Sequence, residues 1–261
     1  MVAGLKELYT FRELLWIWTL REVTVRYKQS FFGVAWAVLQ PLALMAAFTL
    51  VATFLRGLIE TEGVPYPIYY YSALLPWTFF SNSVGNGTPS MINNLNLVVK
   101  TYFPREILPI AKVGVSFFDY LVGAVVFVIL FIIYHLPLTA QVLWLPLLLV
   151  LQTILTLGIC FLASAITVVF RDIRFLIPLA LQIMLFITPI IYSVKMVNES
   201  IRPYYLLLNP MAVYIDSYRE VLLYGRPPGA YLPIAAAISV VIFVVGYLVF
   251  KRLEVTFADI I

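Results

Sequence analysis

The chain has 261 residues, of which 63% are hydrophobic and 11% charged, whereas a soluble domain has roughly 45–50% and about 25%. So few charged side chains exclude a large soluble protein. The net charge of +4 comes from Lys and Arg gathered between apolar runs, which membrane orientation explains without nucleic acid as a partner.

The first 30 residues predict an amphipathic helix at the membrane interface. On a helical wheel the polar stripe holds Lys6, Thr10, Glu13, Arg21, Thr24 and Lys28, and the apolar stripe holds Leu8, Phe11, Leu15 and Trp18. An ordinary surface helix is the alternative, but a spanning run follows directly. We do not expect a signal peptide, because no cleavage site follows a clean apolar core.

Six apolar runs are long enough to cross about 30 Å of hydrocarbon as helices. They are residues 31–55, 68–84, 113–134, 142–170, 175–194 and 231–250. The runs are continuous rather than alternating, which favours helices over a barrel. We therefore predict an all-α integral membrane protein made of one transmembrane domain, residues 1–261, with kinks near Pro76 and Pro189.

The distribution of Lys and Arg predicts the orientation of the spans. With the N-terminus inside, most of the 17 cations lie on the cytoplasmic side. Arg56 and the cations of residues 195–226 lie outside. Both termini are therefore predicted to be cytoplasmic.

Two connections are too long to be plain loops. The inside loop 86–109 begins with a polar, cap-rich stretch and predicts a short cytoplasmic helix. The outside segment 195–230 contains two apolar stretches that are too short to span. They predict re-entrant helices at the outer surface, and a lipid-surface lid without function is the alternative.

Catalytic and metal-binding groups are sparse in this sequence. No GxxxxGK[ST] phosphate-binding loop is present, so we do not expect the chain to hydrolyse ATP or to bind a cofactor itself. His135 and Cys160 are each single, which excludes a His-based metal site and an intrachain disulfide. Asp119 is the acid within a span. We expect it to pair near the interface, with Lys112 about two turns away, and the alternative is a proton relay.

Aromatic residues are abundant, with 19 Phe, 17 Tyr and 5 Trp. Many would form interfacial belts, but rings deeper in the spans can stack on the apolar face of a sugar and still offer a hydrogen bond. The candidate residues for lining a glycan conduit are Trp36, Phe48, Phe186 and Tyr192. Packing in the core or against lipid is the alternative for each ring.

Four motifs in order resemble the permeases of ABC exporters of bacterial cell-surface polysaccharides, O-antigen permeases above all. They are VRYKQSFFGVAWAVLQPL (Val25–Leu42), YFPREILP (Tyr102–Pro109), VVFRDIRFLIP (Val168–Pro178) and LNPM (Leu208–Met211) followed by Tyr218 and Arg219. The resemblance covers essentially the whole chain.

This resemblance implies a homodimer in the bacterial inner membrane, working with two copies of a separate ATPase subunit that binds ATP and Mg. Its substrate would be a lipid-linked polysaccharide. The first and fifth spans of both protomers would frame the conduit. The implied site residues are Phe103, Pro104, Arg105 and Glu106 in a coupling helix; Arg26, Tyr27 and Lys28 at the hinge of the interface helix; and Tyr204, Tyr205, Asn209, Pro210, Tyr218 and Arg219 in an outer gate.

Other functions stay open from the sequence. A teichoic acid or capsular polysaccharide permease shares the same motifs. A secondary transporter would be expected to show paired repeats and ionisable groups near the midplane, and a passive channel would not explain the long inside loop. An intramembrane enzyme would need an acid, base or metal cluster that the chain does not supply.

Overall fold

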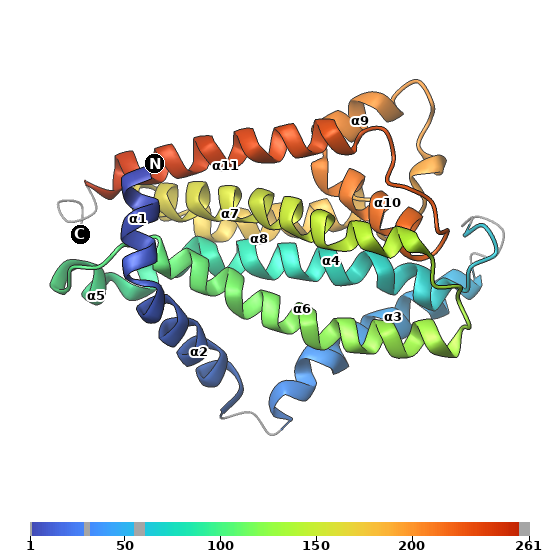
Figure 1. Ribbon diagram of the computed structural model, residues 1–261, viewed down its shortest axis with the longest axis horizontal. Helices are drawn as coiled ribbons and strands as arrows, with labels where there is room; N and C mark the ends of the chain where they lie inside the picture. The colour runs from blue at the N-terminus through green and yellow to red at the C-terminus, as the bar shows by residue number, and fades with distance from the viewer. Residues whose placement is uncertain (1, 29–31, 55–60, 256–261) are drawn as a thin grey trace.

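The computed structural model describes residues 2–28, 32–54 and 61–255, and these segments contain helices and no β-strand. Most helices run along one long axis, with α1 and α5 at one end of the bundle and α9 and α10 toward the other (Figure 1). We call these the α5 end and the α10 end. In chain order the helices are α1 (Val2–Thr10), α2 (Arg12–Lys28), α3 (Trp36–Phe54), α4 (Tyr66–Gly87), α5 (Leu95–Lys100), α6 (Ile107–Ile133), α7 (Leu145–Val169), α8 (Ile173–Ile187), α9 (Arg202–Leu208), α10 (Pro210–Leu222) and α11 (Leu232–Glu254).

Four helical segments of the described chain are long and apolar enough to cross a membrane. They are Gly33–Phe54, Ile107–Ile133, Ala140–Val169 and Leu232–Glu254, and they overlap the predicted spans 31–55, 113–134, 142–170 and 231–250. Phe31, Leu55 and Arg56, the predicted limits of the first span, lie outside the described residues. The chain therefore has the helices of a multi-pass membrane protein.

The predicted span 175–194 falls on α8, which is shorter than expected. α8 has 15 residues, and a helix of that length rises only about 22 Å. It ends at Ile187 because Thr188 is extended and the following Pro189 has no N–H to continue the helix. Pro189 therefore follows the end of a helix, and the predicted kink at this residue is wrong.

The predicted span 68–84 falls on α4, a helix of 22 residues that is buried along most of its length. Because α4 lies inside the bundle, it carries Tyr, Ser and Asn side chains where a lipid-facing helix would be apolar. α4 continues through Pro76, and the Gln152 amide on α7 donates a hydrogen bond of 2.7 Å to the Pro76 carbonyl.

Two glycines allow α7 and α11 to pack at close range. A Cβ atom at Gly246 would lie 2.1 Å from the Gly158 carbonyl oxygen, and one at Gly158 would lie 2.6 Å from the Phe243 backbone. Small residues are what permit helix backbones to approach in membrane proteins. This contact fixes the last span against the centre of the bundle.

The N-terminal segment forms two helices, α1 and α2, rather than the single helix predicted for residues 1–30. The predicted apolar stripe, including Leu8, Phe11 and Trp18, packs against a core cluster formed by α6, α7 and α11. Protein therefore covers part of this stripe, whose side chains are half-buried. Trp16 and Ile17 of α2 are exposed and remain available to the membrane surface.

Candidate functional site

The segment between α5 and α6 is a turn and not the coupling helix implied by the FPRE motif. The short helix of this connection is α5, which ends at Lys100, and Thr101 is extended. Pro104 disfavours a helical conformation at the preceding Phe103, so helix resumes only at Ile107, whose N–H bonds the Pro104 carbonyl at 3.1 Å.

The FPRE side chains bond this turn to α11, the last helix of the chain. Phe103 and Pro104 are buried, and Glu106 is 0% exposed and forms an ion pair with Lys251 of α11. The Tyr247 hydroxyl also donates to Glu106 Oε1 at 3.3 Å. Arg105 Nη1 donates to the backbone carbonyl of Glu254. The turn and the end of α11 are therefore tied together at the α5 end.

The exposed part of the same connection lies just before the motif. Val99, Lys100, Thr101 and Tyr102 are exposed, and we call these four residues the exposed stretch. The Tyr102 hydroxyl donates to Glu7 Oε1 of α1 at 2.9 Å, and this bond raises the pKa of Tyr102. The coupling residues implied by the resemblance are Phe103–Glu106 and do not include these four, although the quoted motif begins at Tyr102.

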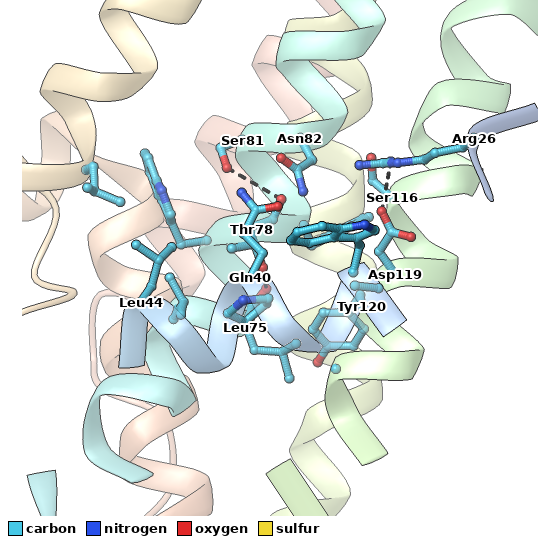
Figure 2. A pocket seen from close by; sticks show the side chains of 18 of the residues that line it. Arg26, Gln40, Leu44, Leu75, Thr78, Ser81, Asn82, Ser116, Asp119 and Tyr120 are labelled. Carbon is cyan, nitrogen blue, oxygen red and sulfur yellow. Dashed lines mark hydrogen bonds and ion pairs between the residues drawn. The ribbon is translucent and has the colours of Figure 1, made fainter. Parts of the chain in front are cut away.

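A cavity of about 200 Å³ opens between α2, α3, α4 and α6. Arg26 of α2 points toward Asp119 of α6 at one side of it (Figure 2), and Arg26 Nη1 lies 2.8 Å from Asp119 Oδ2. The Tyr27 hydroxyl donates to the other oxygen of Asp119. Lys28 is exposed at the end of α2.

The partner predicted for Asp119 is wrong. Lys112 instead pairs with Glu22 of α2 at 2.5 Å, while Asp119 pairs with Arg26. Two ion pairs therefore join the interface helix to α6. The sequence could not supply these partners, because each pair joins residues that lie far apart in the chain.

Arg219 of α10 is a buried residue that makes several contacts at the α10 end. It is 2% exposed, and its guanidinium lies over the Tyr69 ring at 3.7 Å from the centroid. Nη1 donates to the carbonyls of Pro189 at 2.6 Å and Tyr192 at 3.0 Å, and Nη2 donates to the carbonyl of Ile190 at 2.6 Å. Arg219 thus supplies donors to the non-helical residues that follow α8.

Arg219, the end of α8 and the non-helical residues that follow it are called the Arg219 junction below. Two further predicted gate residues contact this junction. Asn209 accepts from the Ala212 N–H at the start of α10 and donates to Thr188 Oγ1 at 3.1 Å. The Tyr205 hydroxyl donates to the Ile187 carbonyl at 2.8 Å. The structure therefore brings Arg219, Asn209 and Tyr205 together around the end of α8.

The remaining predicted gate residues have different surroundings. Tyr204 is 67% exposed and Tyr218 is 1% exposed, while Pro210 is the first residue of α10. Tyr218 therefore faces the protein interior. An apolar stretch in the sequence does not reveal which of its polar members point inward.

The four predicted conduit aromatics have different surroundings. Trp36 is 49% exposed and Phe186 58% exposed, and Trp36 also lines the cavity. Phe48 stacks on Tyr70 with ring centroids 4.9 Å apart. The Tyr192 hydroxyl donates to the Ile187 carbonyl. Trp36 and Phe186 are thus the two whose rings are more accessible.

A cluster of ion pairs connects the loops at the α10 end. Glu62 pairs with Lys195 and with Arg226, the latter at 3.1 Å, and Arg226 lies 3.6 Å from Glu220. The hydrogen bond from Lys195 lowers the pKa of the Glu62 carboxyl. Within residues 2–28, 32–54 and 61–255, no group of three or more His, Cys, Asp or Glu is placed to hold a metal ion.

Replacing Tyr214 with Phe should weaken the contact between α10 and α11. The Tyr214 hydroxyl lies 2.6 Å from Ser239 Oγ in a buried contact, and such bonds between membrane helices contribute about 0.6–1.7 kcal/mol. We expect the free energy of unfolding in detergent to fall by that amount. Tyr204→Phe, an exposed tyrosine of the same segment, is the control. An equal fall in both variants would contradict the assignment.

Residues 13–223 match the model of the family described as "ABC-2 type transporter". That match covers most of the chain. The chain belongs to the ABC-2 type transporter family. It is 31% identical over 262 residues to the O-antigen export system permease protein RfbA of Myxococcus xanthus, with 99% of each chain covered. It is 30% identical over 251 residues to the protein of the same name from Klebsiella pneumoniae, with 95% of each chain covered.

Each of the three regions falls within this ABC-2 transporter match. The cavity, the turn before α6 and the Arg219 junction all lie between residues 13 and 223. A membrane protein of this family is the transmembrane part of an ABC transporter.

Proposed function

We infer that this chain is the membrane subunit of an ATP-driven exporter that moves lipid-linked O-antigen across the bacterial inner membrane. The observation that carries this proposal is the similarity, over nearly the whole chain, to permeases named for O-antigen export. The chain has no nucleotide-binding motif, so ATP and Mg would be bound by a separate ATPase subunit.

The proposed topology has six spans: α3, α4, α6, α7, α8 and α11. α4 joins the four apolar candidates because it is as long as a span and buried among them, and α8 joins with the non-helical residues that follow it. Both termini would be cytoplasmic, because α1 and the last turn of α11 share the α5 end (Figure 1). Lys251 and Arg252 in that last turn agree with this side.

The proposed assembly is a homodimer with a glycan conduit framed by α3 and α8. Neither helix has a buried residue, although α4 between them is mostly buried. α8 exposes Phe175, Leu179, Ile183 and Phe186. Apolar helices that are this open in one chain are available to a second copy, to lipid or to a conduit.

Energy from ATP hydrolysis would arrive through the exposed stretch that precedes the turn. The exposed residues Val99–Tyr102 would contact the ATPase subunit, and the buried FPRE turn behind them would pass their displacement to α6 and α11. A rigid tie is needed for this, because a small shift is transmitted only through packed elements. At the opposite end, α9 and α10 would form the outer gate above the end of α8.

Arg105→Ala is expected to leave the permease in the membrane and to abolish export. The substitution removes the guanidinium that bonds the Glu254 carbonyl and leaves the buried Glu106 pair in place. Export would be measured as O-antigen at the cell surface, and assembly by copurification with the ATPase subunit. Arg171→Ala, an exposed arginine between α7 and α8, is the control. Normal export by the Arg105 variant would contradict the coupling role.

A further inference from the structure

The cavity between α2, α3, α4 and α6 holds polar side chains that the packing of the chain does not use. Gln40 of α3 and Asn82 of α4 both line it, and both lie at its wall in Figure 2. In the described part of the chain neither side-chain amide makes a hydrogen bond, whereas Thr78, Ser81 and Ser116 bond to backbone carbonyls of their own helices. The two amides are therefore free to bind a ligand.

Aromatic and charged groups complete the wall. Trp36, Trp77 and Tyr120 line the cavity together with Arg26 and Asp119. An amide or a carboxylate can bind sugar hydroxyls, because each hydroxyl both donates and accepts. An indole ring offers an apolar face for stacking. This combination favours a sugar over a lipid tail.

The size of the cavity limits the ligand. Its volume of about 200 Å³ is below the roughly 300–1,000 Å³ of sites for drug-sized molecules. A single sugar ring is the appropriate size, and a longer stretch of glycan is not. Its position agrees, because α2 ends at Lys28 and α3 begins at Trp36, where the interface helix turns into the first span.

We propose that this cavity binds one sugar ring of the lipid-linked glycan, with the amides of Gln40 and Asn82 on its hydroxyls and Trp36 against its apolar face. The proposal rests on the export function inferred above and adds the place where substrate is recognised. Asp119 pairs with the Arg26 guanidinium at the edge of the site, and the Tyr27 hydroxyl donates to the other oxygen of Asp119. The ring bound would be the one nearest the lipid, because the cavity lies beside the interface helix.

The test uses the complete complex of permease and ATPase in proteoliposomes. The stimulation of ATP hydrolysis is measured against the concentration of lipid-linked glycan purified from the same bacterium, and separately against the same lipid phosphate without sugar. The variants are Asn82→Leu and Gln40→Leu. The control is Asn86→Leu, one turn further along α4, exposed and outside this cavity.

We expect the glycan concentration for half-maximal stimulation to rise about tenfold in Asn82→Leu, the loss of about one good hydrogen bond. The response to sugar-free lipid phosphate should match that of the wild type, and the control Asn86→Leu should leave both basal hydrolysis and the response to glycan unchanged. Gln40→Leu, at an exposed position, should show the same shift without loss of folded protein. A wild-type response to glycan by both variants would overturn the cavity assignment alone.

Two other results would also be decisive. Equal weakening toward glycan and sugar-free lipid phosphate would mean that the cavity binds the phosphate, which overturns the sugar site. A wild-type complex that glycan does not stimulate would overturn the export function, and the sugar site with it. The wild-type curve therefore separates the failure of the two proposals.

Discussion

Arg219→Ala is expected to remove most of the permease from the membrane and to stop export. The guanidinium is the donor to three carbonyls in the non-helical residues after α8. Each buried carbonyl left without a donor costs about 1–3 kcal/mol. Their sum approaches the stability of a whole domain, about 5–15 kcal/mol. The measurements are the amount of protein in the membrane and the unfolding temperature in detergent.

Arg219→Lys should fall between the alanine variant and the wild type, because an ammonium keeps the charge but lacks the planar fork that reaches separate carbonyls. Arg202→Ala is the matched control. Arg202 also donates to backbone carbonyls, those of Lys195 and Val197, but Arg202 is only half-buried, so water can replace part of what it donates. An Arg219→Ala protein that accumulates and exports normally would contradict the role of this residue at the gate.

Replacing Lys251 and replacing Glu106 should lower the free energy of unfolding by different amounts. Lys251→Met leaves a carboxylate that is 0% exposed without its cation, and an unpaired buried charge costs about 3–5 kcal/mol. Glu106→Gln leaves Lys251, which is 28% exposed and still lies 2.8 Å from Glu254. We expect this variant to lose less stability. The unfolding free energy in detergent compares the two.

The double variant Glu106→Gln/Lys251→Met separates stability from coupling. With both charges gone it should recover much of the stability lost in Lys251→Met, but export should stay low because the turn and α11 have lost the ion pair that joins them. Lys195→Met is the control, since its pair with Glu62 is exposed and worth about 1 kcal/mol or less. Export restored in the double variant would show that the pair only stabilises the fold.

Local composition was sufficient to predict the helices but not all of their ends. Continuous apolar runs predict helices because lipid offers no partner to the backbone, and the described chain is helical throughout its long elements. The end of α8 at Ile187 depends on Pro189 and on the carbonyls that Arg219 takes up. The sequence shows the proline but not the arginine that compensates for it.

The sequence did not show which residues of the candidate site are exposed or how its charged residues pair. The motif located the turn at Phe103–Glu106, yet Phe103 and Glu106 are buried and the exposed residues precede them. Asp119 was expected near Lys112 on its own helix, whereas Arg26 is its partner. Pairings between helices depend on how the bundle packs, and hydropathy carries no information about that.

We propose that energy for export comes from a separate ATPase that acts on this chain. The most direct test is to reconstitute the purified permease in proteoliposomes with and without its partner ATPase subunit, and to measure translocation of lipid-linked glycan. We predict translocation that requires both the ATPase and ATP, and that stops when Arg105 is replaced with alanine. Translocation by the permease alone, or a permease that does not bind the ATPase, would contradict the account.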